Sequence, residues 1–96
     1  MKAVSSLLPG FLRQVAKDET AAFACLCEFW PRIVGQQLAS RTSPLQLNRR
    51  HLILAVPSES WQDELAGMTA MLIESVNNFW QMRLIERISL KVHQSD

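Results

Sequence analysis

Arginine is unevenly distributed along this 96-residue chain. Between Phe29 and Ser58 the sequence has four arginines and no carboxylate, whereas between Glu59 and Met82 it has four carboxylates and neither lysine nor arginine. The formal net charge of +1 conceals this separation. A local group of cations, rather than the overall balance, attracts a polyanion at short range. The chemistry to consider first is therefore the binding of phosphate groups.

Six cationic side chains are the candidate contacts with a nucleic-acid backbone. They are Arg41, Arg49, Arg50, Arg83, Arg87 and Lys91. These side chains form one surface if the turn near residues 48–51 and the last predicted strand are neighbours, and they then neutralise phosphates and release counterions. The alternative is that they are ordinary solvated cations, and the sequence alone leaves both interpretations open.

The three tryptophans, Trp30, Trp61 and Trp80, are candidate platforms for stacked bases. All three also fall at helical spacing with other apolar residues, which favours packing in the core. Trp61 differs from the other two because a residue in the first turn of a helix is often only partly covered. We therefore keep Trp61 as a candidate for stacking or for contact with a partner.

Catalytic chemistry has little support in the sequence. His51 and His93 are the only histidines, and no serine, cysteine or carboxylate pair has the spacing of an activated nucleophile. Cys25 and Cys27 are two residues apart, so on a helix their side chains diverge and do not readily chelate a metal or form a disulfide. A P-loop motif is absent. The sequence predicts a protein that is not an enzyme and that uses no metal or cofactor.

Length and composition predict one domain over residues 1–96, with a core spanning about residues 8–92. Apolar residues make up 48% and charged residues 20% of the chain, which is typical of globular proteins. No stretch approaches ~18 consecutive apolar residues, and Pro9-Gly10 ends the N-terminal apolar run too early for a signal sequence. We expect a cytoplasmic protein that binds neither a membrane nor a small-molecule substrate.

Two helices are predicted in the N-terminal part of the chain. Apolar residues recur at helical spacing over residues 8–15 and again over residues 23–38, with a short acidic turn between them. Asp18 or Thr20 is expected to cap the second helix.

Pro31 falls inside the second helical pattern. Because proline lacks the N–H and clashes with the preceding turn, we expect a kink or a fresh helix start, with Pro31 in the first helical position. Gly35, one turn later, is expected to permit close backbone packing.

After Ser40 the period of the pattern changes to two, which predicts strands. Leu45 and Leu47 alternate with polar residues, residues 52–56 form a β-prone apolar run, and residues 48–51 lie where a hairpin turn belongs. Alternation returns over residues 84–92. There Leu84 is expected to share an apolar face with Ile88, Leu90 and Val92, opposite a cationic face formed by Arg83, Ile85, Arg87, Ser89 and Lys91.

One long acidic helix is predicted between these strands, over residues 60–80. Ser60 and Asp63 have the spacing of a capping box, and carboxylates suit the amino terminus of a helix. The expected buried stripe is Trp61, Leu65, Met68, Leu72, Val76 and Phe79, and the residues expected away from it are Gln62, Asp63, Glu74 and Asn77.

These elements predict an α+β fold in the order α-α-β-β-α-β. We expect a two-layer sandwich in which one three-stranded sheet has its helices on one face. The other face of the sheet is then open and basic.

The sequence resembles the DciA family, which comprises bacterial relatives of the loader or operator of the replicative helicase. The residues that carry the resemblance are Trp30-Pro31-Arg32-Ile33-Val34-Gly35, Leu38-Ala39, Thr42, Pro44, the strand over residues 52–56, Ser58, Trp61, Glu64-Leu65 and Asn77. The resemblance covers about residues 8–92. It implies a KH-like domain, binding to single-stranded or tailed DNA, and contact with the DnaB-type replicative helicase.

Two observations leave alternatives open. A KH domain normally grips nucleic acid through a GxxG loop, and this chain, whose glycines are Gly10, Gly35 and Gly67, has none. In addition, the acidic helix over residues 60–80 suits a basic protein partner. A protein-interaction adaptor, or an RNA-binding module without a role in helicase loading, is therefore the alternative to a DNA-binding accessory factor.

Overall fold

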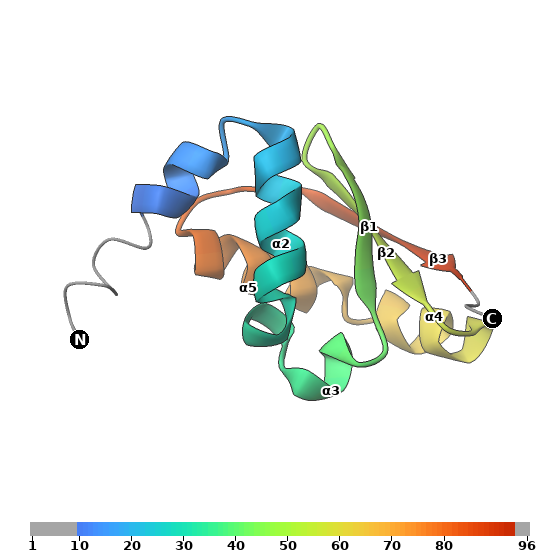
Figure 1. Cartoon of the computed structure of the whole chain (residues 1–96). Helices are drawn as coiled ribbons and strands as arrows, with labels where there is room; N and C mark the ends of the chain where they lie inside the picture. The colour runs from blue at the N-terminus through green and yellow to red at the C-terminus, as the bar shows by residue number, and fades with distance from the viewer. Residues whose placement is uncertain (1–9, 94–96) are drawn as a thin grey trace.

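A three-stranded sheet carries its helices on one face, as the sequence predicted (Figure 1). The computed structural model describes residues 10–93, so Leu8 lies outside the described part. Residues 10–15 are helical. The elements that follow are α2 (Glu19–Val34), α3 (Gln36–Ala39), β1 (Ser43–Asn48), β2 (His51–Val56), α4 (Glu59–Ala66), α5 (Thr69–Trp80) and β3 (Arg87–Val92). The predicted α+β class and element order are confirmed.

The sheet has the order β1-β2-β3, with β2 in the centre. β1 pairs antiparallel with β2, and β3 pairs parallel with β2. Leu47, Leu52 and Ile88 are register partners across the three strands, and all three contact the core. Because side chains alternate along a strand, Arg87, Ser89 and Lys91 project from the opposite, open face, and all three are exposed.

Arg49 and Arg50 form the turn between β1 and β2, which confirms the predicted hairpin. Both residues have positive φ, 51° and 65° respectively. Two consecutive residues with φ > 0 correspond to the turn that matches the twist of a hairpin and that usually contains asparagine and glycine. A side chain with a Cβ is strained in this region, so arginine at both positions costs stability.

Helix α2 begins at its predicted cap. The Asp18 carboxylate accepts hydrogen bonds from the backbone N–H groups of Thr20 (3.0 Å) and Ala21 (3.4 Å). The predicted start at Pro31 is wrong, because α2 continues through Pro31 to Val34. A proline so near the end of a helix removes one backbone hydrogen bond, and the burial of the adjacent Trp30 offsets that loss.

The break in the helix occurs at Gly35 instead. Gly35 has φ 94°, and α3 begins at the next residue. The prediction that Gly35 allows close backbone packing is also wrong, since a Cβ at this position would meet no atom within 4 Å. The glycine is needed here for its backbone conformation, which turns the chain toward β1.

The predicted long helix over residues 60–80 is two helices, α4 and α5, separated at Gly67 and Met68. The cap of α4 is also different from the prediction: Ser58, not Ser60, accepts a hydrogen bond from the Trp61 N–H at 3.4 Å. The predicted spacing of buried apolar residues nevertheless continues from α4 into α5, because Leu65, Leu72 and Val76 are all buried. A periodic pattern therefore did not reveal that the backbone changes direction.

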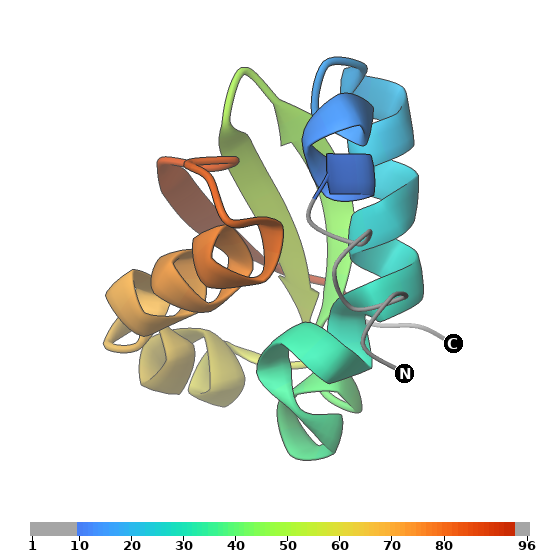
Figure 2. The same cartoon turned by 90° about the vertical axis from the view of Figure 1, so that its left-hand side faces the viewer.

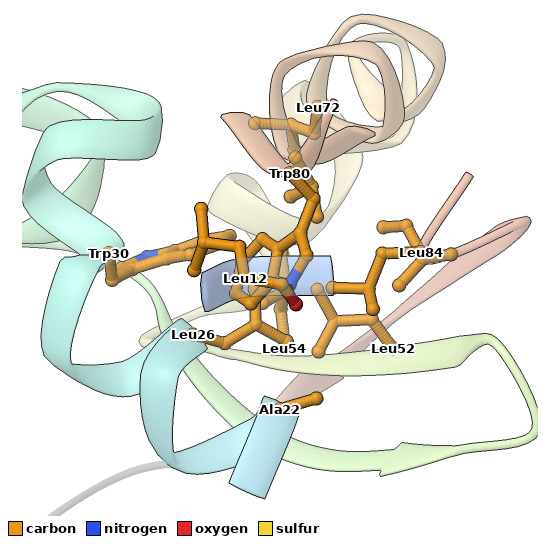
Figure 3. Close-up of a cluster of buried hydrophobic side chains, with 11 residues drawn as sticks. Leu12, Ala22, Leu26, Trp30, Leu52, Leu54, Leu72, Trp80 and Leu84 are labelled. Carbon is orange, nitrogen blue, oxygen red and sulfur yellow. Dashed lines mark hydrogen bonds between the residues drawn. The ribbon is translucent and has the colours of Figure 1, made fainter. Parts of the chain in front are cut away.

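The core lies between the helices and the sheet (Figures 2 and 3). Its buried side chains are Leu12, Ala22, Leu26, Trp30, Leu52, Leu54, Leu72, Val76, Trp80, Leu84 and Ile85. The indole N–H of Trp30 donates to the hydroxyl of Thr42 (3.0 Å), and that of Trp80 donates to the carbonyl of Leu12 (2.9 Å). Each buried indole thus keeps its hydrogen bond while it joins distant segments.

The segment before β3 differs from the predicted strand. β3 begins at Arg87, and residues 81–86 form a connection in which Leu84 and Ile85 are both buried. The expectation that Ile85 and Arg83 lie on the open face of the sheet is therefore wrong. Arg83 belongs to the connection.

Candidate nucleic-acid interface

Three connections converge at one end of the molecule: the turn at residues 16–18, the hairpin turn at Arg49-Arg50, and the connection over residues 81–86. The first two lie side by side at the top of Figures 1 and 2. The backbone N–H of Arg49 donates to the Glu19 carboxylate at 2.7 Å. The carbonyl of Arg50 accepts from the N–H groups of Glu86 (2.7 Å) and Arg87 (3.2 Å). The hairpin turn is thus fixed to both of the other connections. We call this part of the molecule the hairpin end.

A cleft of about 280 Å³ lies at the hairpin end. Its lining includes four cationic residues, Lys17, Arg49, Arg50 and Arg83, together with the carboxylate of Glu19. All four cations are exposed. An apolar wall of the cleft is formed by Ala22, Leu47, Met82 and Leu84. We call this site the hairpin-end cleft.

The positive charge of the cleft is only partly compensated. Arg50 pairs with Glu86 at 3.6 Å, and both side chains are about half exposed, so the pair contributes little. Within residues 10–93 this is the one ion pair closer than 4 Å. The Glu19 carboxylate is held by the backbone of Arg49. Lys17, Arg49 and Arg83 therefore keep their charged groups available for an anion.

The open face of the sheet continues from the hairpin end. Arg87 is the register partner of His51, and Lys91 is that of Ala55. The side chain of His51 hydrogen bonds to the hydroxyl of Ser89 at 2.6 Å. This face therefore carries Arg87 near the cleft and Lys91 four residues further along β3.

Arg41 lies at the opposite end of the sheet, just before β1 begins. Its guanidinium group lies over the ring of Trp61, 5.9 Å from the ring centroid, which is within the range of a cation–π contact. Arg41 and His93 line a second cleft of about 320 Å³ there. The six predicted cations therefore do not form one compact group: Arg49, Arg50 and Arg83 line the hairpin-end cleft, Arg87 lies next to it, and Lys91 and Arg41 are progressively farther away.

The three tryptophans differ in burial, as the sequence suggested. Trp30 and Trp80 are buried in the core. Trp61 is half-buried, and Arg41 covers part of its ring. A base that stacked on Trp61 would have to share or displace this contact.

The two cysteines show no features of a reactive site. Cys25 is partly buried, and this burial, with a smaller contribution from the charge of Glu28, raises the pKa of its thiol. Burial likewise raises the pKa of the Cys27 thiol. Within the described residues, no three side chains of the metal-binding types lie together, and no helix there has the length and apolar character needed to cross a bilayer.

Sequence reasoning missed Lys17 at the hairpin end and the role of Asn77 on α5, which supports it. Lys17 was not distinguished from other surface lysines, because only the tertiary fold places it in the same cleft as Arg83. Asn77 was assigned to the exposed side of a helix, but its side chain hydrogen bonds to the backbone of Leu84 and Ile85. The available signal was that Asn77 belongs to the set of residues that carries the family resemblance.

The fold and the cleft define a small α+β domain with a cationic concavity at one end of its sheet. The model of the family described as "Dna[CI] antecedent, DciA" matches residues 3–90 of the chain. The chain belongs to the DciA family, as its sequence suggested. Membership implies a role as a replicative-helicase loader in DNA replication, and this family of accessory factors is not a known enzyme family. A search among curated proteins finds no match to the chain.

Proposed function

We propose that this protein binds single-stranded or tailed DNA through its hairpin end, contacts the DnaB-type replicative helicase, and assists the loading of that helicase. The family supports the role in loading. The observation that carries the DNA-binding part is the hairpin-end cleft, where four exposed cations line one concavity. A concave cationic site concentrates the positive potential that a phosphate backbone meets.

The backbone of the hairpin turn is a second argument for this site. Arg49 and Arg50 both have positive φ, where glycine or asparagine fits at lower cost. Backbone strain that persists in a folded protein often marks a position where the side chain has a function. Two arginines in this turn project positive charge at the end of the sheet.

The proposed phosphate contacts are Arg49, Arg50 and Arg83 in the cleft, with Arg87 beside it. Lys91 extends this surface along the open face of the sheet. Arg41 is assigned to a secondary contact, because it lies at the opposite end of β1 and contacts Trp61. Trp61 belongs to the same distant end and is proposed as a partner contact rather than as a stacking platform.

DNA binding is tested by fluorescence anisotropy with a labelled single-stranded oligonucleotide at several salt concentrations. Neutralisation of about 3 to 4 phosphates predicts a slope near −2 to −3 in log K against log salt. A chain that shows no binding at low salt would remove the DNA-binding part of the proposal.

The helicase contact is tested by a pull-down with the host's replicative helicase, with and without single-stranded DNA. We expect capture in both cases and stronger capture with DNA. If the purified helicase is captured neither with nor without DNA, the loading role is contradicted.

The alternative function is an adaptor that uses the acidic surface of α4. Glu59, Asp63 and Glu64 are all exposed there, away from the hairpin end. Under this alternative no DNA binding is detected at moderate salt. An RNA-binding role would instead appear as a preference for an RNA oligonucleotide over the DNA of the same sequence.

A further inference from the structure

The hairpin-end cleft combines two kinds of surface that binding to a phosphate alone does not require. Its cationic side comes from Lys17, Arg49, Arg50 and Arg83. Its other side is apolar. Leu84 and Ala22 are buried, while Leu47 and Met82 are half-buried and keep part of their surface accessible.

We propose that this cleft takes one unstacked nucleotide of a single strand, with its phosphate on Arg49 and Arg83 and its base against Leu47 and Met82. The inference rests on the DNA binding proposed above and assigns a mode of recognition to the same site. A nucleotide has a charged phosphate and a flat face of low polarity, and the two sides of the cleft match these two parts. Contact between a base and an apolar side chain is tolerant of sequence, because every base has a flat face that burial against such a side chain removes from water.

The volume of the cleft suits a single nucleotide. Sites for drug-sized ligands occupy about 300 to 1,000 Å³, and the hairpin-end cleft, at about 280 Å³, is at the small end of this scale. One base with its sugar and phosphate is of this size.

This occupant explains why a single strand or a tail would be preferred to a duplex. A base in a duplex is paired and stacked, and extruding it costs a few kcal/mol, whereas a base in a single strand is already accessible. The cationic side of the cleft would attract any phosphate backbone, but the apolar side is reached only by a base that has left its stack.

The first test compares two oligonucleotides with equal numbers of phosphates, an oligo-dT and a fully abasic strand of the same length. We expect the abasic strand to bind the full chain about 10-fold more weakly, because it lacks the base that would bury the accessible apolar surface of Leu47 and Met82. Equal affinities for the two strands would overturn the inference while leaving the proposed DNA binding intact. Absence of binding to either strand would instead overturn the proposed DNA binding, and with it the inference.

A second test locates the base with methionine methyl NMR. Met82 lines the cleft, whereas Met71 is 48% exposed on α5 and lies outside it. Thymidine 5′-monophosphate is expected to shift the Met82 methyl resonance and leave that of Met71 in place, and inorganic phosphate is expected to shift neither. Two results would show that the base does not enter the cleft. One is an equal shift of the Met82 methyl resonance with phosphate and with the nucleotide, and the other is a Met82 resonance that neither ligand shifts.

A matched pair of variants links these two tests. Met82→Ser is expected to weaken the affinity for oligo-dT at least 3-fold and to leave the affinity for the abasic strand unchanged. Met71→Ser is the control, and it should alter neither. A Met82→Ser variant that binds oligo-dT as tightly as the unchanged chain would contradict the inference.

Discussion

The side chain of Asn77 on α5 hydrogen bonds to both backbone polar groups of Ile85. Its amide donates to the Ile85 carbonyl at 3.0 Å, and its oxygen accepts from the Ile85 N–H at 3.0 Å. The same oxygen accepts from the Leu84 N–H at 2.9 Å. A single side chain of a core helix therefore makes three hydrogen bonds to the connection that carries Arg83 into the hairpin-end cleft.

Removal of this side chain should destabilise the protein. Asn77→Leu removes the partner of both the N–H and the carbonyl of Ile85, whereas the Leu84 N–H keeps its bond to the Met82 carbonyl (2.9 Å). Each buried group that loses its partner costs about 1 to 3 kcal/mol. We expect the free energy of unfolding to fall by about 2 kcal/mol, as measured by urea denaturation. Asn77→Asp, which keeps the accepting oxygen but loses the donor, should cost less. An Asn77→Leu variant with an unchanged unfolding midpoint would show that these hydrogen bonds are not needed.

The hairpin turn should gain stability and lose affinity when its residues are changed to those that fit its backbone. In Arg49→Asn/Arg50→Gly, relief of the strain at positive φ should raise the free energy of unfolding by about 1 kcal/mol. Loss of two phosphate contacts should reduce the magnitude of the salt slope for single-stranded DNA by about 1.4. Both quantities are measured on the same sample, by thermal denaturation and by anisotropy titration.

Opposite changes in stability and affinity separate a functional effect from misfolding in this variant. A more stable protein that binds DNA with unchanged affinity and salt slope would remove the hairpin turn from the interface.

The amino terminus of α4 provides a test with an internal control. Ser58→Ala should lower the free energy of unfolding by about 1 kcal/mol, because its hydroxyl accepts from the Trp61 N–H. Ser60 is exposed and lies inside the helix, so Ser60→Ala should change the stability by less than about 0.5 kcal/mol. Thermal melts of the two variants decide between the two caps, and a larger loss for Ser60→Ala would favour the capping box that the sequence suggested.

Trp61→Ala should affect stability more than DNA binding. The indole is half-buried and contacts Arg41, so its removal should lower the free energy of unfolding by about 2 kcal/mol. The affinity of the folded fraction for single-stranded DNA should stay within about 2-fold, because Trp61 lies at the end of the sheet opposite the hairpin-end cleft. A variant with an unchanged melt that binds no DNA would show that Trp61 contacts the strand.

Local sequence signals predicted the parts of the fold that depend on near neighbours. Alternation and the β-prone run located the hairpin, and Asp18 was one of the two residues expected to cap α2. Two expectations were wrong, a fresh helix start at Pro31 and one unbroken helix over residues 60–80. The helix α2 continues through Pro31 beside the buried Trp30, and the chain bends at Gly67 without disturbing the apolar spacing.

The candidate site was predictable only in part. The charge separation along the sequence pointed to Arg49 and Arg50, and the alternation over residues 84–92 placed Arg87 on a cationic face. Whether that face adjoins the hairpin turn was open until the pairing of β2 with β3 was known. The position of Lys17 follows from a contact between segments far apart in the sequence, the hydrogen bond of Arg49 with Glu19. The position of Arg83 follows from the hydrogen bonds between Asn77 and Ile85, which fix the connection after α5. No local pattern encodes which turns converge at one end of a sheet.

The most direct test of the hairpin-end cleft as the DNA-binding site is a pair of charge reversals, measured by anisotropy with oligo-dT. Arg83→Glu reverses a charge in the cleft, whereas Arg32→Glu reverses an exposed charge near the far end of α2, about 20 Å along the helix from Glu19. Both variants have the same net charge. We predict that Arg83→Glu weakens binding at least 10-fold and that Arg32→Glu weakens it less than 3-fold. Equal losses for the two variants, or no loss for Arg83→Glu, would contradict the assignment of DNA binding to this cleft.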